Sequence, residues 1–265
     1  MELLQPRQSL LAGLHNPQGR TVAVLRLFAL AADDVLVVLP RDLAAPVLSR
    51  LRRYVLRAKL TLGDESPAWG VVGVRTPAPE APAIASGVAA CVDGSASRWM
   101  LVMPHPGIAG NIQLPAGTRA LSRGEWRQAD IAAGLPQVYA ATSEAFVAQM
   151  LNLDCVSAVS FRKGCYTGQE IIARAHYRGR VKRRMQRFRV RARAVPAPGD
   201  TGRLGDGRSF VVVDATPSGE AAIELLAVAP LTAAGNQDEG DTGDTRGQPV
   251  VLDAEALPLP YPLPD

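Results

Sequence analysis

Cysteine is scarce in this sequence, which has only Cys91, Cys155 and Cys165 and contains no Cys-x-x-C pair. An odd number without such a pair indicates neither a disulfide framework nor a zinc site. We therefore expect no metal site, and thiols that stay reduced in the cytoplasm.

Long apolar runs are lacking as well. The longest apolar stretch, residues 22–39, contains Arg26, Asp33 and Asp34, and such charges argue against a membrane span. The first residues, MELLQPR, do not have the basic-then-apolar order of a signal peptide. The sequence thus predicts a cytoplasmic protein without a membrane partner, and we expect a monomer.

Aromatic residues make up only 5% of the 265 residues, so the core must rely on leucine, valine and alanine. A chain of this length buries enough surface for one large domain or two ordinary ones.

Positive charge is concentrated in one part of the chain. Residues 162–193, here called the basic band, hold twelve lysines and arginines against one acid, Glu170, while the whole chain carries a formal charge of +4. Such a band indicates an anionic partner, and nucleic acid, a phosphate or a polyglutamate tail would each qualify. The alternative is a solvated face without a partner.

Hydrophobic periodicity predicts an α+β fold with antiparallel sheets. HNPQGR, residues 15–20, has the proline and glycine of a type I turn between two strands. Helical spacing occurs in residues 42–59, 122–136 and 143–153, with Ser143 as N-cap of the last. Strand patterns occur in residues 21–39 as a hairpin, and in residues 68–74, 87–92 and 98–104.

From Lys182 onward the pattern changes to strands alone, which predicts a small β-barrel or sandwich from about residue 183 to the end. Arginines at positions 187, 189, 191 and 193 alternate there with apolar residues, so one face is cationic. Residues 235–247 are polar and glycine-rich and indicate a long loop.

The segment RKGCYTGQE, residues 162–170, combines a thiol, two cations, two glycines and a carboxylate. Thr167 and Glu170 have capping-box spacing, which predicts a helix with Thr167 as N-cap. Cys165 then lies near the positive end of the helix dipole and beside Lys163, and both favour the thiolate. A reactive cysteine is one interpretation. A tight strand-to-helix connection with small residues is the other.

None of the three histidines is an obvious base for this thiol. His176 follows on the predicted helix, where a rise of about 1.5 Å per residue places it on the order of 12 Å away. His15 and His105 stand in no informative sequence context. A cysteine–histidine pair is therefore not expected.

The cations of the basic band that follow this segment have two interpretations, a footprint for RNA or another polyanion and an exposed face without a partner. Interleaved aromatic residues would favour RNA, but only Tyr177 and Phe188 are present, and Phe188 alternates inward. The polyanion-binding candidates are Arg174, Arg178, Arg180, Lys182 and Arg183.

Residues 134–185, from GLPQVYAATSEAF to RVKRRM, closely resemble the signature region of the YgfZ folate-binding proteins, relatives of the glycine-cleavage T-protein, an aminomethyltransferase. KGCYTGQE is highly specific for that family, and HNPQGR and RRYVLRAKLTL resemble its earlier landmarks. The resemblance covers most of residues 10–230.

The resemblance implies a T-protein-like, folate-binding α+β body for residues 1–182 and a C-terminal β-barrel domain for residues 183–265. It implies binding of tetrahydrofolate or another reduced folate and a role in assembly or repair of iron–sulfur clusters. Iron–sulfur client proteins would then be partners, and through them the protein would be linked to tRNA modification.

Site residues carry over from the family position by position. Cys165 matches the motif cysteine, with a functional role beside Lys163, and Trp126 stands where the family has a tryptophan associated with folate. A flat indole suits stacking on a pterin or aminobenzoate ring, and a core tryptophan is the alternative. The other matching motif residues are Gly164, Tyr166, Thr167, Gly168, Gln169 and Glu170.

The chain departs from the related aminomethyltransferases at two positions. They carry a glutamate where DIAAG has Ala132, and an aspartate just after the early turn, where this chain continues with Arg20 and Thr21. The QGQ segment usual before that turn is also missing, which predicts a shortened N-terminal part. We therefore do not expect an active aminomethyltransferase.

Three functions follow in order of preference. The first is a folate-binding accessory protein of iron–sulfur assembly or repair, with Cys165 as the reactive or partner-contacting group. The second is an RNA-binding protein that acts directly on tRNA through residues 174–193. The third is a folate-dependent one-carbon transferase, which the missing aspartate disfavours.

Overall fold

The computed structural model describes residues 9–77, 79, 81–84, 86–93, 97–105, 112–179, 181–219, 221–232 and 250–264. The chain divides into two compact units, the first comprising Met1–Ala12 and Leu25–Trp126 and the second Gly13–Val24 and Arg127–Asp265. The boundary predicted at residue 182 stays a prediction. None of the helices in the described ranges is long and apolar enough to span a membrane.

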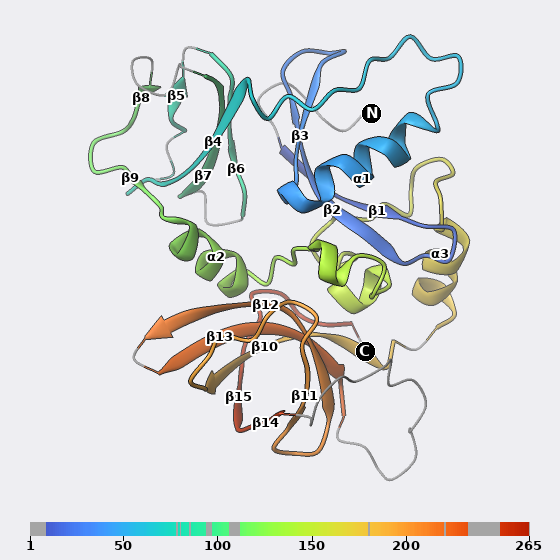
Figure 1. The fold of residues 1–265 in the computed structure, drawn as a ribbon, viewed down its shortest axis with the longest axis vertical. Coiled ribbons are helices and arrows are strands. Elements are labelled where there is room, and N and C mark those ends of the chain that lie inside the picture. Colours follow the sequence, from blue (N-terminus) through green and yellow to red (C-terminus); the bar gives the residue numbers. More distant parts are fainter. Residues whose placement is uncertain are drawn as a thin grey trace. The chain divides into compact units, whose positions relative to one another are not determined.

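The first unit contains the antiparallel strands predicted for it. The sheet order is β6-β7-β4-β9, with β4 at Trp69–Arg75, β6 at Val88–Cys91, β7 at Arg98–Pro104 and β9 at Arg119–Ala120 (Figure 1). A second pair is formed by β5 (Ala83–Ile84) and β8 (Ile112–Gln113). Successive residues of β7 join two different apolar clusters. Both faces of this strand are therefore buried, which explains the apolar run that follows Arg98 in it.

The predicted early turn and hairpin are confirmed. Strands β1 (Ser9–His15), β2 (Thr21–Ala29) and β3 (Val35–Val38) form a sheet in this order. In the turn between β1 and β2, the Gly19 N–H donates to the Asn16 carbonyl at 2.9 Å. Gly19 has a φ of 71°, which a glycine adopts without strain.

The first predicted helix is shorter than expected. Helix α1 spans Arg41–Arg52 instead of residues 42–59. Leu43 and Val47 are buried, whereas Leu56 is 86% exposed. The apolar residues beyond the helix end thus face no core, and most helical stability in proteins comes from such packing. The helix predicted in residues 122–136 is confirmed as α2, Arg123–Ala132.

The helix predicted for residues 143–153 is wrong. One short 3₁₀ turn, η3 (Ala148–Leu151), lies in this segment and another, η2 (Ala140–Thr142), directly precedes it, while Glu144 and Asn152 have positive φ angles. The Ser143 hydroxyl donates to the Val22 carbonyl and caps no helix. The backbone of this segment forms hydrogen bonds with β2 instead, because the Glu144 N–H donates to the Thr21 carbonyl. Tertiary partners here override the local helical pattern.

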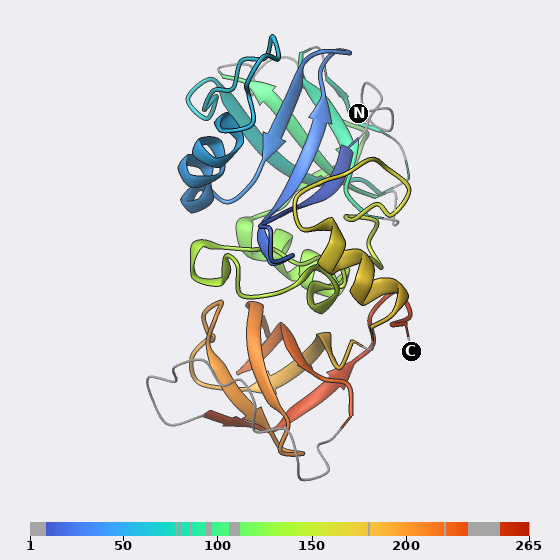
Figure 2. The ribbon, with the colours of Figure 1, turned by 90° about the vertical axis from the view of Figure 1, so that its right-hand side faces the viewer.

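The end of the second unit is a nearly closed, barrel-like sheet of order β14-β11-β12-β13-β10-β15, as the strand chemistry predicted (Figure 2). Its strands are β10 (Arg183–Arg191), β11 (Thr201–Leu204), β12 (Ser209–Gly219), β13 (Ala222–Pro230), β14 (Val250–Leu252) and β15 (Ala254–Leu257). Phe188 and Val190 face a core shared with Phe210 and Leu225. The acidic loop predicted at residues 235–247 lies outside the described residues.

Candidate functional site

The cysteine segment, residues 162–170, lies against the early turn within the second unit. Gly168, with a φ of 79°, sits so close to this turn that a Cβ there would lie 2.9 Å from the Gly19 Cα and would collide with the Asn16 carbonyl oxygen. Only glycine meets both the positive φ and this close backbone approach. Two of the segments that carry the family resemblance, KGCYTGQE and HNPQGR, are therefore neighbours in space.

The start of helix α3 (Gln169–Tyr177) differs from the prediction. Its N-cap is Gly168 and not Thr167, and no side chain caps it, so the predicted Thr167–Glu170 capping box is wrong. The segment is held by Gln169 instead, whose side-chain oxygen accepts from the Tyr166 N–H at 3.2 Å. Gly168 has a left-handed conformation at the N-cap, which a glycine adopts without strain.

The three cysteines stand in different surroundings. Cys165 is exposed, whereas Cys91 and Cys155 are half-buried. The Cys91 thiol donates to the Asp93 carbonyl at 2.8 Å. Burial, followed by the charge of Asp154, raises the pKa of Cys155 to about 11. Of the three, Cys165 is thus the thiol that another molecule can reach, and its preference for the thiolate form stays a prediction.

Three side chains lie in a row near Cys165, those of Lys163, Tyr166 and His15. The Lys163 Nζ lies 4.9 Å from the ring centroid of Tyr166. On the inner side, the Tyr166 and His15 rings are 6.4 Å apart and tilted by 44°. His15 was given no role by the sequence, because its approach to the segment depends on how β1 and α3 pack.

Burial at the end of this row favours the neutral form of His15. It is 4% exposed, and burial, with a smaller contribution from the charge of Lys163, lowers its pKa to about 4. Its Nδ1 lies 3.4 Å from the Thr21 hydroxyl. Among the described residues, neither the His15 Nε2 nor the Tyr166 hydroxyl has a hydrogen-bond partner. The pKa of Tyr166 is raised by the same burial.

Trp126 belongs to the first unit, whereas the cysteine segment belongs to the second. Its indole packs against the backbone of Gly73, where a Cβ would collide with it, and the Arg98 guanidinium carbon lies 4.7 Å from the ring centroid. The indole also borders an apolar cluster of that unit. It thus has partners within its own unit, and stacking on a folate stays a prediction.

The cations of the basic band that lie on the barrel are largely paired. Glu224 of β13 accepts from Arg187 at 2.6 Å and from Arg189 at 3.1 Å. Arg184 is buried and forms an ion pair with Asp154 at 3.0 Å. Arg183, predicted to bind a polyanion, donates to the Ser209 hydroxyl at 3.2 Å. Two arginines of the face that looks cationic in the sequence, Arg187 and Arg189, are therefore paired with acids of neighbouring strands.

Helix α3 carries exposed charge of a different kind. Arg174 and Arg178 are both exposed, and neither forms an ion pair within the described ranges. Lys182 is exposed between α3 and β10, and Arg180 lies outside the described residues. His176 is stacked on Phe161 with ring centroids 3.9 Å apart.

Comparison with known proteins identifies the class to which this arrangement belongs. No family model matches the chain. A protein of Klebsiella pneumoniae (strain 342) named tRNA-modifying protein YgfZ is 32% identical, over 78% of this chain and 68% of that protein. Proteins of the same name from Enterobacter sp. (strain 638) and Yersinia pseudotuberculosis are 30% and 29% identical, and the latter match covers 99% of this chain. The chain belongs to the YgfZ family.

Proposed function

We propose that this chain serves in tRNA modification, as the name of its relatives states for them. We propose further that Cys165 is the residue through which it reacts or contacts a partner. The observation that carries the proposal is the exposure of this one thiol in the segment that packs on the early turn. An exposed thiol beside a cation is the setting in which cysteines react or contact partners.

The role in tRNA modification is tested in a bacterium that lacks its own YgfZ protein. We expect this chain to restore the modified nucleosides that the strain has lost, measured by mass spectrometry of digested tRNA. An expressed, folded chain that restores none of them would contradict the proposal.

We further propose that the chain acts through iron–sulfur enzymes, as an accessory protein of cluster assembly or repair. The family resemblance and the exposed thiol support this route. In the same strain, the chain should restore nucleosides made by iron–sulfur enzymes. Nucleosides made by other enzymes should have the same level with and without the chain. Equal changes in both groups would reject this route.

A reduced folate, with tetrahydrofolate as the first candidate, is proposed as the ligand. The fit of a folate to the described residues is partial, because the Trp126 indole offers a flat apolar surface but already packs on Gly73 and beneath Arg98. Calorimetric titration with tetrahydrofolate should show saturable binding that Trp126→Ala weakens. Trp99→Phe is the control, since Trp99 borders another apolar cluster of the same unit. An absence of binding would remove folate from the account.

A further inference from the structure

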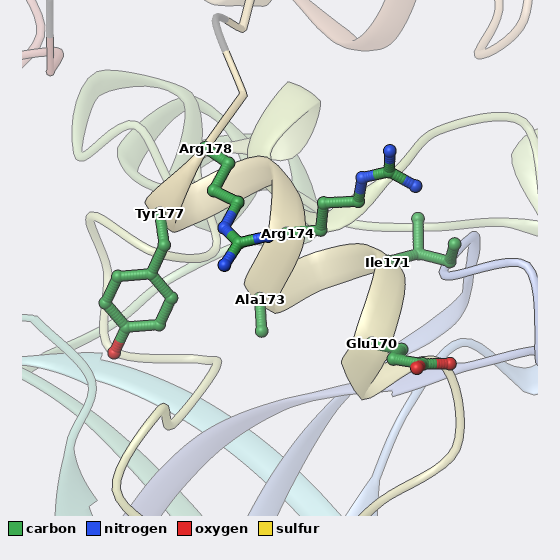
Figure 3. Close-up of a pocket in the computed structure, with 6 residues that line it drawn as sticks. All are labelled: Glu170, Ile171, Ala173, Arg174, Tyr177 and Arg178. Atoms are coloured by element: carbon green, nitrogen blue, oxygen red, sulfur yellow. The ribbon is translucent and has the colours of Figure 1, made fainter.

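Helix α3 has a hollowed outer surface at its exposed side. The hollow has a volume of about 480 Å³ and lies over the helix (Figure 3). Figure 3 shows Glu170 at the amino end of the helix, Tyr177 and Arg178 at its carboxyl end and the small Ala173 between them. The lining residues are Glu170, Ile171, Ala173, Arg174, Tyr177 and Arg178.

The positive charge of this surface is available to a ligand. Arg174 lies in the last turn of α3 and Arg178 is its C-cap, and both line the hollow. Both are exposed and form no ion pair within the described part of the chain, in contrast to Arg187 and Arg189 on β10. The single acid of the lining, Glu170, stands at the other end of the helix. An anionic ligand would therefore be held near the carboxyl end.

An aromatic platform lies beside these charges. Tyr177 is 70% exposed, although its ring contacts two other rings. Those rings, Phe161 and His176, stand at 72° and 79° to it, with centroids 6.0 and 4.8 Å away. Neither is stacked parallel on Tyr177, and together they fix the orientation of its ring. The structure thus shows that Tyr177, already visible in the sequence, is an exposed ring held in place by Phe161 and His176.

We propose that this α3 surface binds single-stranded nucleic acid, with a base stacked on Tyr177 and backbone phosphates on Arg174 and Arg178. Exposed aromatic rings beside cations are the usual means of binding single strands, because every base has a π-face and every nucleotide carries a charge. This goes beyond the proposed function, since support of tRNA modification requires no direct contact with nucleic acid.

Binding is measured by fluorescence anisotropy with a labelled oligouridine, with oligothymidine and poly-L-glutamate as further arms. We expect both oligonucleotides to bind and poly-L-glutamate to bind at least about tenfold more weakly, because it carries charge without bases. The tighter of the two oligonucleotides identifies RNA or DNA as the source of the ligand. Absence of oligonucleotide binding, or equal binding of poly-L-glutamate, overturns the proposal.

Variants separate the two components of the surface. Tyr177→Ala should weaken oligonucleotide binding at least about fivefold, and Tyr177→Phe should not, because stacking needs the ring and not the hydroxyl. Arg174→Ala and Arg178→Ala should each reduce the slope of log K against log salt by about 0.7. Tyr54→Ala and Arg189→Ala are the controls, since Tyr54 is an exposed tyrosine of the first unit and Arg189 is already ion-paired.

The outcomes distinguish this inference from the proposed function. Circular dichroism of each variant confirms that it is folded, which is expected because the three substituted side chains of α3 are exposed. If Tyr177→Ala binds like the parent chain, the stacking site is rejected, whatever the effect of the chain on tRNA in cells. If the chain fails to restore modified nucleosides but binds oligonucleotides as described, only the proposed function is rejected.

Discussion

Gly168 shows why a single residue without a side chain is required in the cysteine segment. Its positive φ and its contact with the Asn16 carbonyl and Gly19 leave no room for a Cβ. Gly164, directly before Cys165, has no atom within 4 Å of the position that a Cβ would occupy. Two glycines of one short segment thus have different structural reasons to be glycine.

These two glycines give a matched pair of variants. Gly168→Ala should lower the free energy of unfolding by about 1–3 kcal/mol, because it adds both backbone strain and a collision. Gly164→Ala should change it by less than about 0.5 kcal/mol, as expected where the added methyl meets nothing. Urea denaturation measures both. Equal stabilities of the two variants would contradict the described packing of the segment on the early turn.

His15 predicts a pH dependence of stability. Its pKa is about 4 in the folded chain against an ordinary value of 6.5. Between these values the unfolded chain binds a proton that the folded chain does not, so acidification destabilises the fold. The contribution is fully present above the unfolded pKa and is lost as pH falls through this window, by at most about 1.4 kcal/mol per pH unit.

The His15 contribution is isolated by comparing the parent chain with His15→Phe. Urea denaturation at about pH 7 and about pH 5 should show a smaller loss of stability for the variant, because phenylalanine binds no proton. The groups facing His15 are Thr21, Lys163 and Tyr166. The same loss in both chains would show that His15 is not held neutral by the fold.

At the scale of elements, the pairing between strands determines which arginines of the basic band are ion-paired. The period of two in residues 187–193 correctly predicts that Phe188 and Val190 face the core. It does not reveal that Glu224 lies beside Arg187 and Arg189, because that depends on the register of β10 and β13. The local pattern is readable from sequence, whereas partners from distant segments are not.

Two glutamates that contact the same arginine test this pairing. Glu224→Gln should lower the free energy of unfolding by about 1–3 kcal/mol, because Glu224 is 7% exposed and bonded to two arginines. Glu255→Gln should have an effect within about 0.5 kcal/mol, since Glu255 is 65% exposed and 3.5 Å from Arg189. Thermal unfolding of both variants is the measurement. A larger effect at Glu255 would contradict the described register.

The failed helix in residues 143–153 has the same origin. Its apolar residues repeat at helical spacing, yet Phe146, Leu151 and Leu153 are buried around a single 3₁₀ turn, η3. The backbone there forms hydrogen bonds with Thr21 of β2, and the local sequence pattern does not indicate this partner. Helix α2 was predictable because its apolar residues have helical spacing and Gly134 and Pro136 follow its end.

For the whole molecule, the α+β class, the antiparallel sheets and the barrel-like end followed from periodicity and turn residues. The cysteine segment was recognisable because it is contiguous in sequence. His15 and the packing of the early turn were not, since they join the site only through the fold. The relatives named tRNA-modifying protein YgfZ confirm the family, and the role of Cys165 within it is the central claim.

That claim is tested most directly by the tRNA of a bacterium that lacks its own YgfZ protein and carries either Cys165→Ser or Cys91→Ser. Serine keeps the size and the hydrogen-bond donor of each thiol, so both variants should fold, and immunoblotting confirms equal amounts. We predict that Cys91→Ser restores the modified nucleosides and that Cys165→Ser does not. Full restoration by Cys165→Ser would contradict the account.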